Sequence, residues 1–590
     1  MILIRLTIKI VLFLVFFVPS RHIYIIEKQM MKTKALILGL GVLLMTSCSG
    51  KLGQLTSDNF KVTPNPLESE AGQVAATVNG TFPEKYMKKK AVVTVVPELR
   101  FTKDGIQQSV KGQPATFQGE KVLGNDQTIS YVLGGHYTMK TQFPYEDAMQ
   151  KSEFFLTFDA KVGKKAVQVP AVKVADGVIA TSELWHKSLQ QSTGSVAQDA
   201  FQRVVAQKQE ANIKFLIQQA ELRKSELKNG SVQEFVTLLK QISQDRERLN
   251  LQNVEVSAYA SPDGGFTLNE KLANQRQQKV EGYVKQQMKQ AKLTEPIEAN
   301  YTAQDWEGFQ QLVAASNIQD KDVILRVLSM YKDPEEREQQ IKNMSAGFRE
   351  LADGILPELR RARMTINYET IGRNDQQIQQ QLKDDATQLS IEEMLYAATL
   401  TDNAAEKKDI YEKTTRQYAQ DVRAFNNLAT LAWQQGNYTE ARQWLEKAQN
   451  VKADCPEVLA NLGMLALQQG DLQNAENYIG RAAGAYNLAE ALGNLHLAQG
   501  NYALAAQDMK DVVSNSAGLA QLLNKDYVTA AQTLRAIKNS NGLTDYLQAI
   551  VCARQGNEGM AGFFLRQAIE KDASLAAYAA NDLELSKVEK

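Results

Sequence analysis

The stretch from Leu251 to Gln287, LQNVEVSAYASPDGGFTLNEKLANQRQQKVEGYVKQQ, predicts a strand, a tight turn and a helix in succession. Residues 254–260 alternate apolar with polar or small side chains, the period of a half-buried strand. Residues 261–265, SPDGG, then form a turn. We expect Arg276 on the polar side of the helix that follows, whose apolar face is Leu268, Leu272, Val280, Tyr283 and Val284. Together these elements make a ledge on which a small ligand could be bound.

The sequence on either side extends this unit into an α/β domain over residues 210–370. A helix is expected at 232–249, with Phe235, Leu239 and Ile242 on its apolar face. Residues 306–348 read as a helical insertion before the last strand. Three further strands are expected, at 211–217, 297–301 and 359–368.

The turn and helix carry a spaced set of residues: Gly264, Asn269, Leu272, Ala273 and Arg276. This set resembles the OmpA-like peptidoglycan-associated domain, whose helix has the pattern Asn-x-x-Leu-Ser/Ala-x-x-Arg. The two arginines that open the strand at 359–368 resemble the closing strand of that family. The resemblance implies an α/β fold that docks on peptidoglycan.

In that family an aspartate after the second strand and the helix arginine hold the diaminopimelate of the peptide stem. Arg276 matches the arginine, and a guanidinium can bind a carboxylate through two hydrogen bonds. Ser261 stands at the aspartate position, and Asp263 is the candidate substitute. The expected peptidoglycan site is therefore Arg276, Asn269 and Asp263. The alternative is a structural copy of the fold, with Arg276 solvated or in a salt bridge.

Residues 55–182 are expected to form a β-rich, sandwich-like domain. Short runs of β-branched and aromatic residues alternate with turn signals such as Lys103-Asp104-Gly105. Strands are expected at 92–97, 128–133, 154–160 and 167–170. Without any pattern of reactive residues, the domain reads as a spacer or a partner-docking module. Residues 183–209 are expected to be a connector that becomes helical.

Periodic sequence begins at residue 391 and runs to about residue 580. Gly436-Asn437-Tyr438, Gly470-Asp471-Leu472 and Gly500-Asn501-Tyr502 recur, each followed by an alanine three residues later. The pattern resembles the tetratricopeptide repeat, and residues 525–530 and 556–561 read as degenerate copies. The resemblance implies an all-α solenoid with a groove. The groove either binds a partner protein, or the repeats only hold the protein together. Residues 371–390, polar and rich in glutamine, read as a linker or an exposed helix.

The N-terminus reads as a leader that covers residues 1–47, with the true start at Met30 or Met31. A charged segment and a short apolar run precede Met45-Thr46-Ser47-Cys48, which resembles a bacterial lipobox. The resemblance implies lipidation of Cys48 and an anchor in the outer membrane, facing the periplasm. The alternatives are a signal peptide that contains a cysteine by chance, and residues 1–29 as an additional membrane-associated segment.

The composition argues against several classes of function. The formal net charge of the chain is zero, which does not favour nucleic-acid binding. Four histidines and three cysteines occur without metal-ligand spacing or a catalytic motif. We therefore expect no catalytic residue, no metal and no cofactor.

The expected function is that of an outer-membrane lipoprotein acting as a periplasmic tether or scaffold. The OmpA-like domain would dock on peptidoglycan or an envelope protein, and the repeats would bind a partner protein. One alternative is a pure protein–protein scaffold that does not bind peptidoglycan. A second alternative is an enzyme that processes envelope glycans through the β-rich domain.

Overall fold

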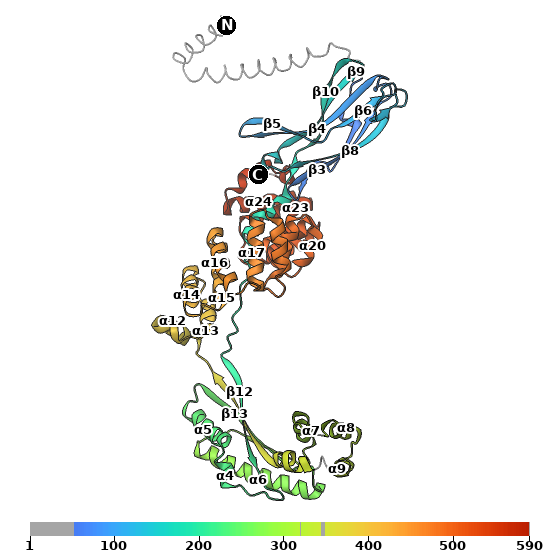
Figure 1. Ribbon diagram of the computed structural model, residues 1–590. Helices are drawn as coiled ribbons and strands as arrows, with labels where there is room; N and C mark the ends of the chain where they lie inside the picture. The colour runs from blue at the N-terminus through green and yellow to red at the C-terminus, as the bar shows by residue number, and fades with distance from the viewer. Residues whose placement is uncertain (1–51, 319, 344–348, 589–590) are drawn as a thin grey trace, which may run out of the picture. The chain divides into compact units, whose positions relative to one another are not determined.

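A computed structural model describes residues 52–318, 320–343 and 349–588. The chain divides into two compact units, shown in Figure 1: Met1–Ala197 with Asn426–Lys590, and Gln198–Phe425. The expected leader and Cys48 lie outside the described residues. Within the described ranges, no helix combines the length and apolarity needed to cross a bilayer.

The unit at residues 198–425 is built on a four-stranded sheet in the order β12-β15-β13-β14. Only β13 and β14 run parallel. One face of the sheet carries the helices α5, Gly230–Gln244, and α6, Phe266–Gln290, whose apolar residues share a core with the strands. All four expected strands are present, with shifted bounds: β12 Val204–Lys214, β13 Leu249–Tyr259, β14 Ile297–Thr302 and β15 Arg361–Ile371.

The expected face of α6 is wrong at two positions. Leu268, placed on the apolar face, is exposed, and Arg276, placed on the polar side, is 1% exposed. The cause is the segment that follows β12, residues 215–222, because its backbone carbonyls bind the arginine. A hydrophobicity pattern cannot anticipate an arginine buried in this way.

The expected helical insertion lies between β14 and β15 and has its own core. Phe309, Ile324 and Leu356 are among its buried residues. Figure 1 shows its first three helices as a group beside the sheet. The elements are α7 Trp306–Ala315, α8 Lys321–Met330, α9 Pro334–Asn343, a π-helical turn Leu351–Ile355 and α11 Leu356–Leu359.

The β-rich region contains two sheets around one core, in agreement with the expected sandwich. Phe82 and Phe117 from opposite sheets pack edge to face, and so do Phe143 and Phe154. One sheet has the order β1-β3-β2-β11, with β8 on β3; the other is β10-β9-β4-β6-β7, with β5 on β4. The strands are β1 Phe60–Thr63, β2 Leu67–Glu70, β3 Gln73–Phe82, β4 Ala91–Lys103, β5 Ile106–Lys111, β6 Ala115–Gly119, β7 Gln127–Ile129, β8 Gly135–Pro144, β9 Ser152–Val162, β10 Lys165–Asp176 and β11 Val178–Ile179.

Two expectations for this half of the chain are wrong. The strand expected at 128–133 ends at Ile129, because the chain turns and the Gly134 amide donates to the Ser130 carbonyl. The connector at 183–209 does not become helical beyond α3, Trp185–Gln190. Residues 192–203 form no helix, because serine, threonine and glycine favour helices weakly.

The repeats form paired helices as expected. Each pair is joined at a residue with positive φ: Gly436, Gly470, Gly500 and Gly556 lie at +74° to +76°, and Lys525 at +65°. The helices are α15 Val422–Gln434, α16 Tyr438–Val451, α17 Pro456–Gln468, α18 Leu472–Gly480, α19 Leu488–Ala498, α20 Tyr502–Asp508, α21 Asn515–Leu523, α22 Tyr527–Ala536, α23 Gly542–Arg554, α24 Glu558–Lys571 and α25 Leu575–Asn581.

Three more helices lie before α15 within the 198–425 unit. They are α12 Asp375–Asp385, α13 Ile391–Ala397 and α14 Ala404–Gln417. The interval expected as a linker or an exposed helix thus contains α12. Asn374 and Gln377 cap its start reciprocally, and Ile378 is buried.

Small residues allow paired helices of the repeats to approach closely. A Cβ added to Gly463 would lie 2.4 Å from Ile479, and one added to Gly493 would lie 2.4 Å from Met509. Ala475, Ala505 and Ala530 are fully buried at the matching position of the second helices. The spacing of small residues in the repeats is therefore a packing requirement.

We predict that Gly493→Ala lowers the free energy of unfolding by about 1–3 kcal/mol, although alanine favours helix, because its methyl group overlaps Met509. Gly559→Ala in α24 is the matched control. A Cβ there meets nothing within 4 Å, so the change is expected to be neutral or stabilising. Thermal unfolding followed by circular dichroism measures both; equal effects would contradict this account of the helix crossing.

Candidate functional site

The first helices of the repeats hold an extended segment of the same chain, Ser192–Ala197. Asn427 in α15 accepts a hydrogen bond from the Ala197 amide (2.8 Å) and donates to the Ala197 carbonyl (2.9 Å). Asn461 in α17 does the same for Ser195, at 2.8 Å in both directions. Each asparagine thus satisfies both backbone groups of one residue, as a neighbouring strand would.

Two regular spacings explain how the asparagines meet the segment: that of residues along an extended chain and that of the helical repeats. In an extended chain, residues two apart present their amide and carbonyl to the same side. Asn427 and Asn461 are 34 residues apart, and each stands nine residues before a turn glycine, Gly436 or Gly470. Two successive repeats therefore offer one carboxamide each to residues 195 and 197. Asn426 adds a second donor to the Ser195 carbonyl at 2.8 Å.

Further side chains fix the segment along its length. The indole of Trp433 donates to the Ser192 carbonyl (2.9 Å), and Gln434 donates to the Thr193 carbonyl (3.0 Å). Gly194 has φ of +74°, and a Cβ there would lie 3.0 Å from Oδ1 of Asn461. The groove thus requires a small residue at this position, and its backbone conformation favours glycine.

Glu490 in α19 closes the same part of the groove. Burial raises its pKa, while hydrogen bonds with Asn487, Ser514 and Thr193 act in the opposite direction. The Asn487 amide donates to this carboxyl at 2.8 Å. The Thr193 end of the segment is therefore bound through a buried acid as well as through carbonyl contacts.

The residues before the segment are also bound to the repeats. Trp185 and Leu189 of α3 are buried, and this helix lies against α17, α19 and α21. The hydroxyl of Tyr578 in α25 donates to the Ala180 carbonyl (3.1 Å). The groove expected to bind a partner protein is thus filled here by residues 180–197 of the chain itself. None of these asparagines was singled out from the sequence, although two of them recur with the repeat period.

The expected peptidoglycan residues lie together at the end of β13. Arg276 donates to the carbonyls of Tyr259 (2.8 Å) and Gln219 (3.0 Å). Its guanidinium also lies over the ring of Phe215, and burial lowers its pKa to about 10. The N–H donors of the Arg276 guanidinium are therefore engaged by backbone oxygens of this chain.

Asp263 and Asn269 are engaged within the protein as well. Asp263 pairs with Arg360 at 3.1 Å and accepts from the hydroxyl of Ser261. Asn269 donates at 2.9 Å to the carbonyls of Ser261 and Gly264, which holds the turn. The next arginine, Arg361, pairs with the buried Asp305 at 3.0 Å. The structure brings the three expected residues together but uses each of them to hold the turn and its neighbours in place.

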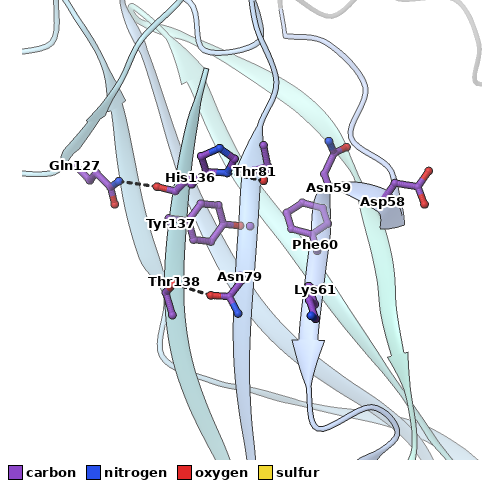
Figure 2. A pocket seen from close by; sticks show the side chains of 11 residues that line it. Asp58, Asn59, Phe60, Lys61, Asn79, Thr81, Gln127, His136, Tyr137 and Thr138 are labelled. Atoms are coloured by element: carbon purple, nitrogen blue, oxygen red, sulfur yellow. Dashed lines mark hydrogen bonds between the residues drawn. The ribbon is translucent and has the colours of Figure 1, made fainter. Parts of the chain in front are cut away.

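The β-rich region has a polar depression of 490 Å³ on β1, β3 and β8. Figure 2 shows Gln127 directed to the His136 carbonyl (2.9 Å) and Thr138 to Asn79 (2.6 Å). The ring of Tyr137 fills the space above Gly80, where a Cβ would lie 2.2 Å from it. The side chains drawn in Figure 2 thus pair across strands, and the hydroxyl of Thr81 lies 2.9 Å from Nδ1 of His136.

Two cysteines lie in the described part of the chain, Cys455 and Cys552, and both are buried free thiols. Burial raises the pKa of each, which disfavours the reactive thiolate. No group of three or more His, Cys, Asp or Glu side chains that could hold a metal ion occurs among the described residues.

Comparison with known proteins identifies the repeats. Tetratricopeptide-repeat models match residues 408–457 and 456–487. This region therefore contains tetratricopeptide repeats, a class of domain that generally binds partner proteins. No curated protein matches the sequence significantly.

Solved structures that resemble the chain cover only part of it. A tetratricopeptide repeat protein from Parabacteroides merdae is 12% identical with a TM-score of 0.27, over 42% of this chain and 98% of the other. PilF of Pseudomonas aeruginosa is 16% identical with a TM-score of 0.26, over 34% and 97%. PilW, a type IV pilus biogenesis factor, is 14% identical with a TM-score of 0.24, over 36% and 95%. These likenesses are too slight to support a statement about function.

We predict that Asn427→Ala with Asn461→Ala releases residues 192–197 from the groove. Asn427→Ala leaves the buried amide and carbonyl of Ala197 without these bonds, and Asn461→Ala does the same to the Ser195 amide, at a cost of about 1–3 kcal/mol per group. Limited proteolysis with elastase, read by mass spectrometry, is expected to cut the double variant within this segment and to spare the unmodified protein. Asn477→Ala, at an exposed asparagine of α18, is the control. Equal resistance of all three proteins would contradict the binding role of the two asparagines.

Proposed function

We propose that this protein is a non-enzymatic scaffold of a bacterial envelope, held to the outer membrane through a lipid on Cys48. The observation that carries the proposal is the set of asparagines that binds a peptide backbone on the repeat helices. Carboxamides that satisfy the amide and carbonyl of an extended chain hold polypeptide in place and supply no reactive group. The tetratricopeptide repeats of this region agree with such a role.

In this proposal the groove binds a segment of its own chain. Residues 180–197 connect the β-rich region to residue 198, where the other unit begins. Because the segment is covalently attached, its effective concentration at the groove is on the order of millimolar or higher. A partner peptide would have to exceed that affinity, so the proposed partner contacts use surfaces other than the filled groove.

The α/β unit is proposed to resemble the OmpA-like domain in fold. The pairing of the first strand with the last, the last with the second and the second with the third supports this likeness, together with the residues Asn269 and Arg276. We propose that it docks on an envelope protein rather than on peptidoglycan. Arg276 is 1% exposed and bound to carbonyls, and Asp263 is neutralised by Arg360. Neither is free to bind a carboxylate or an ammonium group of a stem peptide.

We predict that the unlipidated chain, residues 49–590, stays in the supernatant when it is mixed with purified sacculi and centrifuged. The physical reason is that extracting the Arg276 guanidinium from its carbonyls would leave those carbonyls buried and unpaired. An OmpA-like domain with the family's aspartate and arginine serves as the positive control for the sacculi.

The matched variant is Arg276→Lys, which keeps the positive charge but lacks the planar guanidinium and its several N–H donors. Its fold is checked by circular dichroism before the assay. Retention of the unmodified chain on sacculi, lost in a folded Arg276→Lys protein, would show that peptidoglycan is the ligand and would overturn this part of the proposal.

A further inference from the structure

Three loops meet at the end of the β-rich region where β9 and β10 are joined (Figure 1). They are residues 83–90, 119–134 and 161–165, here called the basic end. The amide of Lys121 donates to the Lys89 carbonyl (2.7 Å), and that of Gly163 to the Lys90 carbonyl (2.9 Å). The amide of Lys85 donates to the Tyr131 carbonyl (2.7 Å). The loops therefore form one ordered surface.

The charge of this surface is strongly positive, although the whole chain is neutral. The three loops contain eight lysines against three acids, Glu84, Glu120 and Asp126. Seven of the lysines are exposed: Lys85, Lys89, Lys90, Lys121, Lys161, Lys164 and Lys165. The eighth, Lys88, lies over the ring of Tyr131 at 4.9 Å. Like charges concentrated in this way favour an anionic partner.

Three aliphatic side chains project from the same loops into solvent. Leu123 has a relative exposure of 101%, Leu133 of 80% and Val132 of 61%. Single exposed aliphatic residues are ordinary on protein surfaces. Here one loop, residues 119–134, carries all three, and backbone hydrogen bonds join it to the lysine-rich loop at 83–90. Exposed aliphatic residues among lysines are typical of a surface that meets a bilayer, where the lysines bind phosphates and the apolar tips enter the acyl boundary.

The chain enters the β-rich region at this end. A Cβ added to Gly53 would lie 3.3 Å from the ring of Tyr86, so the first described residues lie against the loop at 83–90. Leu52 and Leu55 are buried in the same core. Cys48 precedes Leu52 by four residues, a separation that spans at most about 14 Å. A lipid on Cys48 would therefore hold the basic end close to the membrane.

We infer that the basic end is a second membrane contact, which binds the surface of a bilayer containing anionic phospholipid. A nucleic acid would also suit the lysines, but it offers no apolar phase for Leu123, Val132 and Leu133. The inference adds to the proposed lipid anchor without depending on it, because the basic end is tested on protein that carries no lipid.

The test uses residues 49–590 and sedimentation with vesicles of phosphatidylcholine, with or without phosphatidylglycerol. The unmodified protein is expected to bind only the anionic vesicles, and more weakly as salt is added. Lys89→Gln, Lys90→Gln and Lys164→Gln together are expected to lower the partition coefficient by about a hundredfold, since each lysine near an anionic surface contributes about fivefold. Leu123→Ser with Leu133→Ser is expected to lower it by at least about tenfold.

The controls make the same changes elsewhere in the protein. Lys111→Gln, Lys140→Gln and Lys208→Gln remove three exposed lysines outside the basic end, and Ile106→Ser removes an aliphatic side chain that is 66% exposed. Binding within about twofold of the unmodified protein is expected for both controls. No binding to anionic vesicles, or equal losses in the control and basic-end variants, would overturn the inference. So would duplex DNA that binds more tightly than vesicles and is unaffected by the leucine changes.

Palmitate labelling of cells that express the unmodified chain or Cys48→Ser tests the anchor separately. Labelled Cys48 with no vesicle binding would refute only the basic end. Vesicle binding without label would refute only the anchor.

Discussion

The amides and carbonyls of Ser195 and Ala197 impose the constraint on which the first unit depends. These groups are buried in an extended segment, where neither a helix nor a sheet satisfies them. A buried backbone group without a partner costs about 1–3 kcal/mol, so four of them would exclude this path for the chain. Asn427 and Asn461 remove the cost, because each carboxamide accepts from the amide and donates to the carbonyl of the same residue. The repeats therefore bind their own chain by the chemistry with which they could bind another.

The α/β unit uses its polar residues in a similar way. Arg276, which the sequence resemblance suggested as a ligand-binding arginine, donates instead to the carbonyls of Tyr259 and Gln219. Asp263 occupies a turn suited to a ligand, yet Arg360 neutralises it. In both units, side chains that could bind a foreign peptide or carboxylate bind the protein's own backbone or an internal counter-charge. This arrangement favours scaffolding through other surfaces over capture of a ligand at either site.

Much of the fold could be predicted because its signals are local. Alternation at 254–260 predicted β13, and the repeated glycine pattern predicted the helical repeats, whose paired helices are joined at glycines with positive φ. Two of the failures have a common physical cause, since both depend on contacts distant in sequence. Arg276 is buried because residues 215–222 cover it. Residues 192–197 stay out of a helix because asparagines more than 200 positions away bind the amides of Ser195 and Ala197. The 34-residue interval between Asn427 and Asn461 was visible in the sequence. That these asparagines bind residues 195 and 197 could be recognised only once the structure placed that segment in the groove.

Hydrogen exchange of the Ser195 and Ala197 amides tests the central claim most directly, because these two protons are the ones that the asparagines bind. The account predicts protection comparable to that of the buried amides in α17, since opening the segment would expose several bound backbone groups at once. Exchange of both amides at the rate of an unstructured peptide would show that the groove is empty in solution and would contradict the account.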